Sequence, residues 1–553
     1  MDMVNKAMRF RAFPLSAIAA IALAHPAWAE QTADEEASEA RGGRGVTLAP
    51  YIEASQVLVA ELSPGDDVVT YSQVAVGVDA AVTGRNNGGS LSLRYERNIG
   101  YGDEALDSDT VSGVARGYAT VVSRALTIEG GALAARTRVD GNGGATLNPL
   151  VGDDRESRIY SAYAGPNLHT RAGDVEVNAN YRIGYTRVEA PDSVVVSPGQ
   201  SVDVFDESVV QVAGFHAGTS PGEPLPIGLG VGGGWVREDV SNLDQRVEDR
   251  FARADVQVPV GRDLAFVGGV GYEDVEVSSR DAVRDADGNP VLGPDGRFVT
   301  DESQPRQIAY DVSGLIWDVG VMWRPSVRTA LEAHVGRRYD STTYYGTFAW
   351  APTSRSNVNI AVYDTVSGFG GLLNTALANL PTRFTAARNA LSGDFTGCVG
   401  GEQGANCLAG VLGSVRSAVF RSRGIAAGYG VTFGRFNTGL GAGYQQRKFI
   451  AAPGTVLASA NGVVDEAYWV NYYLGAQIGR NAGFDANAYA SWIDSGFAAD
   501  GEVFALGASA AYRRSITGRL SARAAVAVDH LDSEATVEDY TSASALLGLR
   551  YDF

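Results

Sequence analysis

The chain has 553 residues, of which 68 are glycine, and its formal net charge at pH 7 is −19. This acidic balance argues against a nucleic-acid partner, which would require a basic surface for the phosphate groups. The mean hydropathy of −0.06 excludes a membrane protein built from apolar helices. Two classes remain: a large soluble all-β protein, and a membrane barrel whose lipid and water faces average to a value near zero.

Residues 1–29 have the three parts of a cleavable export signal. Basic residues near the start are followed by the apolar stretch 13–24 and then by the small residues Ala27 and Ala29. The apolar stretch is shorter than the roughly 20 residues that a spanning helix needs. We therefore expect cleavage after Ala29 and, in the mature chain, a disordered acidic periplasmic leader at 30–45.

From residue 46 onward the dominant pattern is the alternation of apolar and polar residues, which is typical of strands with one buried and one wet face. The runs at 174–186, 466–478 and 519–529 are examples. Such runs persist for about 11–16 residues, whereas soluble strands have about 5–6 and membrane-crossing strands about 9–11. The lengths predict an all-β fold, a transmembrane antiparallel up-and-down β-barrel at 46–553 with about 22 strands, within a range of about 18–24.

The links between the runs alternate in length. Short links such as 433–435 and 515–518 alternate with long ones such as 140–156 and 279–305. Barrels of the Gram-negative outer membrane show this asymmetry, with tight periplasmic turns and longer external loops. We therefore expect a multi-pass barrel in that membrane, with both chain ends in the periplasm. Arg97 is discordant because it falls on the apolar face of its run, and both a bulge and a place among lipid headgroups would explain it.

The last strand of the chain is apolar on one face. Leu549, Tyr551 and Phe553 share that face, and Phe553 is the final residue. The pattern resembles the C-terminal recognition strand that outer-membrane barrels present to the barrel assembly machinery. The resemblance implies that this machinery and outer-membrane lipid are partners. Aromatic residues near strand ends, such as Trp350 and Trp469, are expected to form interfacial girdles.

Motifs that elsewhere mark cofactor or metal sites fail here on their context. The glycines of 228–233 match a dinucleotide fingerprint but lie inside an alternating strand with no following helix. Residues 285–296 begin like a calcium loop but lack its glycine and its final glutamate, so a β-hairpin is preferred. The histidines lie on different strands, so no metal site, cofactor or enzymatic activity is expected. Glycine stripes at 228–234 and 439–443 are hypothesised to let a loop lie against the wall.

The two cysteines of the chain, Cys398 and Cys407, are expected to form a local disulfide, as is usual in exported proteins. They lie in 367–417, which is too long for a simple hairpin link. Leucines with helical spacing occur on both sides of the cysteines. Two hypotheses remain open for this stapled segment: it folds into the pore and narrows it, or it caps the barrel outside and leaves the lumen open.

If the apolar strand faces meet lipid, the opposite faces line the lumen and carry an excess of arginine. Charged lumen residues set ion preference, so the excess favours anionic or polyhydroxylated solutes through charge-assisted hydrogen bonds. Mutual salt bridges that only stiffen the wall are an equal alternative. The candidate pore-lining residues are Arg182, Arg328, Glu332, Arg338, Arg447, Arg513, Arg519 and Arg523.

Residues 331–369 resemble a family of outer-membrane β-barrel porins found in sphingomonad-type bacteria, some of which are associated with exopolysaccharide systems. The matching features are Gly336-Arg337-Arg338-Tyr339, Tyr345-Gly346 and Pro352-x-Ser354-Arg355. The detailed match covers only about 40 residues, while the architecture extends over the chain. The resemblance implies a porin-like fold and carries over no functional residues.

These observations together predict a channel for the passive diffusion of small hydrophilic solutes. The first alternative is an outer-membrane component of an exopolysaccharide export or assembly system, with polysaccharide as its partner. The second is a structural or adhesive barrel with a closed lumen. A TonB-dependent transporter is not expected, because its lumen holds a folded plug domain and only the short leader precedes the first strand here.

Overall fold

The computed structural model of the chain describes most of the predicted barrel. The predicted signal sequence, with its cleavage residues Ala27 and Ala29, lies outside the described residues, as does the leader up to residue 44. The described residues are 45–101, 108–139, 145–146, 156–189, 194–197, 200–202, 207–222, 224–294, 297–401, 404–412, 415, 418–497, 501–533 and 539–553.

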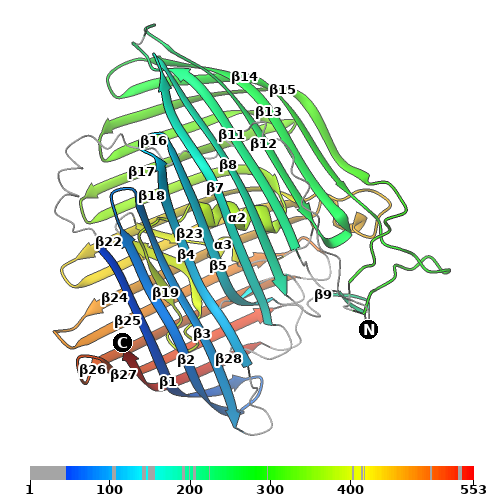
Figure 1. Cartoon of the computed structure of the whole chain (residues 1–553). Helices are drawn as coiled ribbons and strands as arrows, with labels where there is room; N and C mark the ends of the chain where they lie inside the picture. Colours follow the sequence, from blue (N-terminus) through cyan, green and yellow to red (C-terminus); the bar gives the residue numbers. More distant parts are fainter. Residues whose placement is uncertain are drawn as a thin grey trace.

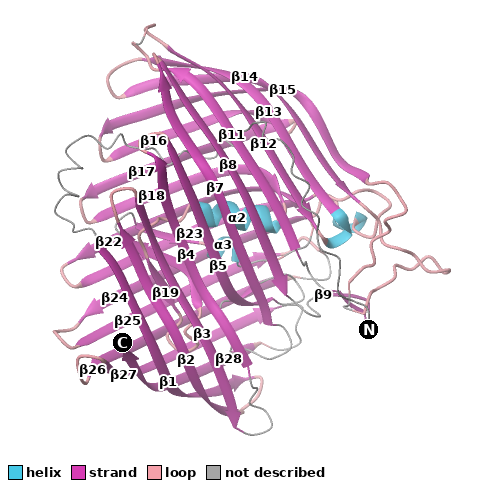
Figure 2. Ribbon diagram, viewed as in Figure 1, coloured by secondary structure: helices cyan, strands magenta, loops and turns pink. Residues whose placement is uncertain are grey.

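In the described residues the barrel wall consists of 22 antiparallel strands. Figures 1 and 2 show that they are arranged in a ring. The strands are between 10 and 20 residues long. They are β1 (Gly45–Ser63), β2 (Val68–Thr83), β3 (Asn87–Tyr101), β4 (Ser108–Val122), β5 (Leu126–Val139), β7 (Glu156–Ala172), β8 (Val175–Glu189), β11 (Glu207–Thr219), β12 (Gly228–Val240), β13 (Gln245–Pro259), β14 (Leu264–Ser279), β15 (Gln307–Ser326), β16 (Thr329–Arg338), β17 (Ser341–Thr353), β18 (Ser356–Ser367), β22 (Phe420–Phe433), β23 (Phe436–Phe449), β24 (Val464–Gln477), β25 (Ala482–Asp494), β26 (Glu502–Ser515), β27 (Leu520–Ser533) and β28 (Tyr540–Asp552).

The ring closes where the first strand meets the last. β1 pairs with β28 from Tyr51 opposite Asp552 onward, and it pairs with β2 on its other side. Every other wall strand pairs with its two neighbours along the chain, so the sheet has no free edge. The predicted up-and-down barrel of about 22 strands is confirmed. The start of β1 and the end of β28 lie at the same end as short links such as 84–86, 434–435 and 516–519, and this end corresponds to the periplasmic end of such barrels. The other end carries the long links and also a few short ones, such as the two-residue link 339–340.

Side chains alternate between the two faces of the wall, as β3 illustrates. Leu93 and Tyr95 are 40% and 42% exposed, whereas Arg94 and Glu96 on the other face are 2% and 3% exposed. The exposed face is apolar, as a lipid-facing surface must be, and the charged face points into the barrel. Within the described ranges, no helix is long and apolar enough to cross a membrane.

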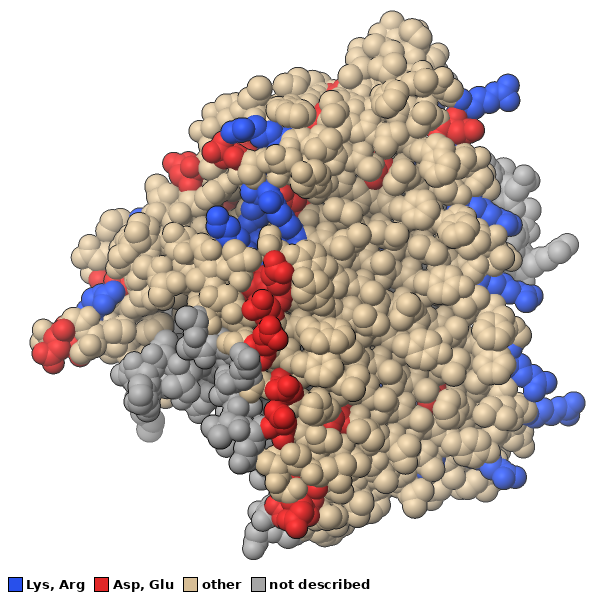
Figure 3. Space-filling model, turned by 180° about the vertical axis from the view of Figure 1, so that it is seen from behind, with Lys and Arg blue, Asp and Glu red and all other residues tan. Residues whose placement is uncertain are grey.

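Charged groups on the outside gather at the two rims. In Figure 3 a broad tan band separates lysines and arginines at the right-hand edge from a line of acidic residues. Arg97, the discordant residue of the apolar run, pairs with Asp109 of β4 at 3.8 Å, and both side chains are about half exposed. The β2–β3 register is continuous at Arg97. Its position near the external end of β3, rather than a bulge, therefore explains this residue.

The external link between β14 and β15 contains the candidate calcium loop. An isolated bridge joins Arg284 to Pro290 across the candidate loop, so this stretch forms a hairpin, and a second bridge joins Ala282 to Thr300 across the whole link. The Asp285 carboxylate accepts hydrogen bonds from the backbone N–H groups of residues 287 and 289, which shapes a turn. The preferred hairpin is confirmed. The remaining short elements are β6 (Ala145–Thr146), β9 (Val194–Ser197), β10 (Gln200–Val202), η1 (Asn242–Asp244) and η2 (Ala458–Ala460).

Candidate functional site: the segment inside the barrel

The long link between β18 and β22 folds into the lumen, and we call residues 368–419 the lumen segment. Figure 1 shows its two helices enclosed by the wall. Of the two hypotheses for this stretch, the structure supports the one in which it enters the pore. Its elements are α2 (Phe369–Ala378), β19 (Thr385–Arg388), β20 (Phe395–Gly401), β21 (Gly404–Cys407) and α3 (Ala409–Leu412).

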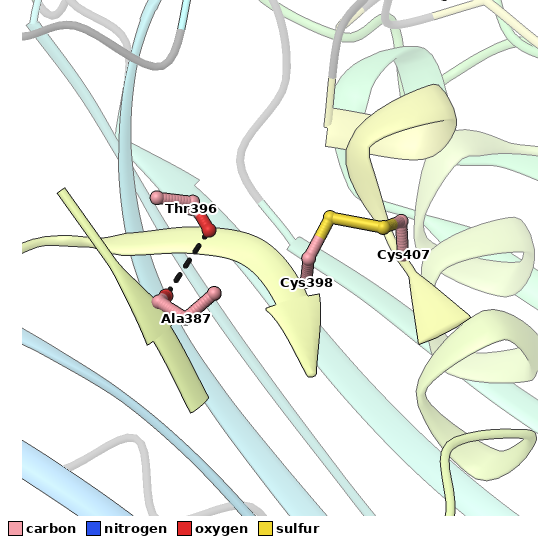
Figure 4. The surroundings of a disulfide bond; sticks show 4 residues. All are labelled: Ala387, Thr396, Cys398 and Cys407. Atoms are coloured by element: carbon pink, nitrogen blue, oxygen red, sulfur yellow. Dashed lines mark hydrogen bonds between the residues drawn. A yellow bond between two sulfur atoms is a disulfide. The ribbon is translucent and has the colours of Figure 1, made fainter. Parts of the chain in front are cut away.

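The disulfide predicted between Cys398 and Cys407 is present. The two residues lie directly opposite each other on β20 and β21, with their Cα atoms 4.0 Å apart. Figure 4 shows the bond near the place where the Thr396 hydroxyl of β20 donates to the Ala387 carbonyl oxygen of β19 at 3.1 Å. The disulfide thus staples the small three-stranded sheet formed by β19, β20 and β21.

Apolar side chains of the lumen segment pack against one side of the wall. Leu373 and Leu377 of α2 are fully buried in a cluster that includes Ile159 of β7 and Val188 of β8. Fully buried leucines each contribute about 1.5–3 kcal/mol relative to an exposed side chain. The leucines with helical spacing therefore form a hydrophobic core between the lumen segment and the wall.

The N-terminus of α2 is held by a carboxylate of the wall. Glu238 of β12 is 0% exposed and accepts hydrogen bonds from the Gly368 and Gly371 backbone N–H groups, both at 2.8 Å. The Ser208 hydroxyl donates a third bond at 2.8 Å. A Cβ atom at Gly371 would lie 2.3 Å from a Glu238 oxygen, so only glycine permits this approach. Helix N-termini favour such negative charge.

Arginines and serines of the wall bind the other part of the lumen segment. Arg136 of β5 and Asp394 form an ion pair at 2.8 Å, with both side chains 4% exposed. The Arg388 guanidinium donates to the hydroxyls of Ser92 at 2.9 Å and Ser112 at 3.0 Å. Burial lowers the pKa of Arg388, and these two hydroxyls replace part of its lost hydration.

Of the eight predicted pore-lining residues, two donate hydrogen bonds to the lumen segment and a third is buried beside it. The Arg182 guanidinium donates to the Thr375 hydroxyl at 3.1 Å, and Arg523 donates to the Ala390 carbonyl at 2.7 Å. Arg447 pairs with Asp465 of β24 at 3.6 Å and lies over the ring of Phe420, the first residue after the segment.

Two of the others bond to side chains of the wall. Arg338 pairs with Asp249 and Glu273 of the wall at 2.7 and 3.1 Å, and Glu332 accepts a bond from His334 at 3.1 Å. Arg513 lies on β26 opposite Arg523 and so takes the same inward face near its end of the barrel. Arg328 and Arg519 lie in the short links 327–328 and 516–519 and are exposed there. Links do not continue the in–out pattern of strands.

A second charged network lies on the inward face of β13 to β17. Arg253 pairs with Asp318 at 2.9 Å, Asp318 lies 2.8 Å from the His334 ring, and that ring stacks on Tyr345 at 4.6 Å. This network could not be found from the sequence, because its members are distant along the chain. Among the described residues, no group of three His, Cys, Asp or Glu is arranged to hold a metal ion.

The two glycine stripes differ in what covers them. At Gly441 an added Cβ would lie 3.1 Å from the Cys407 sulfur, so the lumen segment does approach the wall there. Gly443 is covered instead by Trp469 of the next strand, which therefore faces inward and is not a girdle residue. Gly230 is covered by two wall side chains, His216 and Asp255, which lie 3.1 Å apart, and not by the lumen segment.

The comparisons with known proteins return solved structures of membrane transport proteins. No family model matches the chain, and no curated protein matches it. The chain is similar to the FrpB iron transporter from Neisseria meningitidis (F3-3 variant), with 11% identity over 91% of this chain and 81% of that chain, at a TM-score of 0.43. It is also similar to the siderophore receptor PiuA from Acinetobacter baumannii, with 9% identity over 91% and 82%, at 0.39.

A third similar structure is the alcaligin outer-membrane receptor FauA from Bordetella pertussis. It is 11% identical over 91% of this chain and 76% of that chain, at a TM-score of 0.38. The closed ring with an apolar outer face defines the class of this protein: it is a β-barrel of the Gram-negative outer membrane. The resemblance to an exopolysaccharide-associated porin family gains no support from these comparisons.

The function predicted from the sequence is therefore wrong. Passive diffusion and polysaccharide export both need a wide open path, but the lumen segment is buried inside the ring and bonded to its wall. The similar structures named above are, by title, an iron transporter, a siderophore receptor and an alcaligin receptor. None of the three predicted functions is retained.

Proposed function

We propose that this protein is a ligand-specific outer-membrane transporter whose path is closed by the lumen segment and opens when that segment moves. The observation that carries the proposal is the anchoring of the segment to wall strands on several sides of the lumen. Glu238, Arg136 and Ser92 lie on β12, β5 and β3, and all three bond to it. A barrel of this strand number is wide enough to need such a filling.

The construction allows the segment to move while the barrel stays closed. All wall strands pair with one another, and β18 pairs directly with β22 from Ser356 to Ser367. The ring therefore does not depend on the segment for its hydrogen bonds. Several anchors of the segment are hydrogen bonds and ion pairs to side chains, which water or a ligand can replace at a modest net cost.

The first experiment removes the segment. Ser367 lies opposite Phe420, so residues 368–419 can be replaced by a two-residue Asn-Gly turn that suits a hairpin. In planar bilayers we expect single-channel conductance to rise at least about tenfold over the unmodified protein, because a ring of this size without filling holds water. An unmodified protein that already conducts as well as this variant would overturn the proposal.

A matched control shortens a link that stays outside the lumen. Ser279 lies opposite Gln307, so the external link 280–306 can be replaced by the same turn. Its removal should leave conductance unchanged.

A second variant locks the segment. An added Cβ at Gly184 would touch the Asn374 side chain, so Gly184→Cys with Asn374→Cys should cross-link under oxidation. Uptake of ligand should stop on oxidation and return on reduction, whereas Gly184→Cys alone should not respond.

Ferric siderophores are the first ligands to offer in the uptake assay, because the titles of the similar structures name iron and siderophore transport. The assembly machinery is the proposed partner of β28 and the residue after it: Leu549 and Phe553 are 50% and 65% exposed on the lipid side. Tyr551 packs against Phe553 with ring centroids 5.2 Å apart. The resemblance of residues 331–369 to the exopolysaccharide-associated barrels remains a prediction, and we infer no porin activity from it.

A further inference from the structure

A cavity of about 30 Å³ lies between the lumen segment and the inward face of β24 to β27. The segment contributes Asn389, Thr396 and Cys398 beside the disulfide shown in Figure 4. The wall contributes amide, hydroxyl and phenol groups and a single carboxylate. These wall residues include Asn471, Tyr473, Asn487, Tyr489, Ser509 and Asp529.

Asp529 differs from the other buried carboxylates of the described wall and segment. It is 5% exposed, and its hydrogen-bond partner is the Tyr489 hydroxyl at 3.2 Å. In the described residues no arginine, lysine or histidine forms an ion pair with it. The others have an arginine partner or, for Glu238, three hydrogen-bond donors. Those paired with arginine are Glu53, Glu96, Asp249, Glu273, Asp318, Asp364, Asp394 and Asp465.

The arrangement around Asp529 is built by a glycine. Asp529 and Tyr489 lie opposite Gly507 on its two sides, from β27 and β25. An added Cβ at Gly507 would lie 2.2 Å from the Tyr489 ring and 2.4 Å from an Asp529 oxygen. The bare position thus lets the two side chains meet over β26. It fixes the carboxylate at the cavity, where a buried charge without a countercharge is costly.

We propose that this cavity binds the protonated amine of a small hydrophilic ligand, with Asp529 as its countercharge. The amine would donate hydrogen bonds to the carboxylate and to the side-chain carbonyl or hydroxyl oxygens of Asn471 and Ser509. The rings of Tyr473 and Tyr489 add faces that attract a cation. A divalent metal would need several oxygen ligands with more than one carboxylate, and one acid is present.

The size of the cavity limits what it holds. A volume of about 30 Å³ admits a group of the size of one or two water molecules, so it takes the ammonium end of the ligand and the rest lies outside. The inference rests on the proposed function and deepens it, because it names a chemical feature of the ligand. Since the cavity is bounded by both the segment and the wall, occupation also links ligand binding to the position of the segment.

The test measures binding by the full-length protein in detergent, with ethanolamine as the probe and ethylene glycol as its neutral counterpart. Calorimetry or ligand-observed NMR should detect ethanolamine and not ethylene glycol. Asp529→Asn should weaken ethanolamine binding at least about tenfold, the size of a lost charge-assisted bond. Asp485→Asn, at an exposed acid of β25, should bind like the unmodified protein.

Equal binding of the two probes, or no loss in Asp529→Asn, would overturn the proposal. Absence of ethanolamine binding by the unmodified protein would overturn it too. Heat-modifiable migration on gels shows whether each variant has folded, and Tyr489→Phe, which keeps the carboxylate, should retain amine binding. Because binding is read without transport, these results are independent of the conductance experiment. If the binding test fails and the conductance experiment succeeds, the amine site is rejected and the proposal of a gated transporter stands.

Discussion

Two parts of the lumen wall use their charged side chains differently. On β3 and β5 the inward charges are almost fully buried, and Arg136 bonds to Asp394 of the lumen segment. On β13 to β16 the inward charges bond to one another, and Glu332 remains 37% exposed. Arg136 of the first set anchors the lumen segment, whereas the second set stiffens the wall. Charge on the inner face of a barrel therefore does not by itself define an open path.

The largest effect should come from breaking an anchor. Asp394→Asn leaves Arg136 without its carboxylate, which for a buried pair costs about 3–5 kcal/mol. Hydrogen exchange of the backbone amides in 385–396 should then speed up on the order of 10²–10³-fold. Asp255→Asn, which breaks a pair between two wall strands, is the matched control. If both variants changed exchange in the segment equally, the distinction between the two walls would be lost.

Removing the staple should have the next largest effect. Cys398→Ser with Cys407→Ser frees a loop with a sequence separation of 9, which corresponds to about 2–3 kcal/mol of chain entropy. No other cysteine occurs among the described residues, so no exchange of partners complicates the result. Exchange should rise in β19 to β21 and stay unchanged in the wall strands. A loss of protection around the whole ring would show that the segment supports the barrel.

A smaller change is expected at the α2 N-terminus. Gly371→Ala places a methyl group against Glu238, and overpacking of this kind costs about 1–3 kcal/mol. Urea unfolding in liposomes should show little change, while single-channel recordings should show more frequent opening. Gly314→Ala, where nothing lies within 4 Å of the added Cβ, should match the unmodified protein in both measurements. If Gly371→Ala left the frequency of channel opening unchanged, the result would argue against Glu238 as an anchor of α2.

The smallest effect is expected on the outer face. Arg97→Gln removes a half-exposed pair with Asp109, and such surface pairs contribute about 0–1 kcal/mol. The midpoint of urea unfolding should therefore stay within the error of the measurement, and conductance should not change. A large loss of stability would mean that Arg97 has a role in the wall beyond its place near the rim.

The sequence by itself determined the wall. Alternation over long runs gave the barrel class, the approximate strand number and the lipid-facing side, because membrane and water impose a two-residue period on every strand. The disulfide was also predictable, since two cysteines close in an exported chain have few other partners. Arg182, Arg447 and Arg523 were placed on the inner face by the same alternation, and the structure puts them there.

Only the tertiary structure decided what fills the ring. The partners of Arg136, Glu238 and Asp529 are far from them in sequence or on neighbouring strands, so no local pattern reveals them. The periodicity of a strand states which face a side chain takes, but not whether that face meets water or another part of the chain. That choice depends on where residues 368–419 fold, and it turned an expected open pore into a closed lumen.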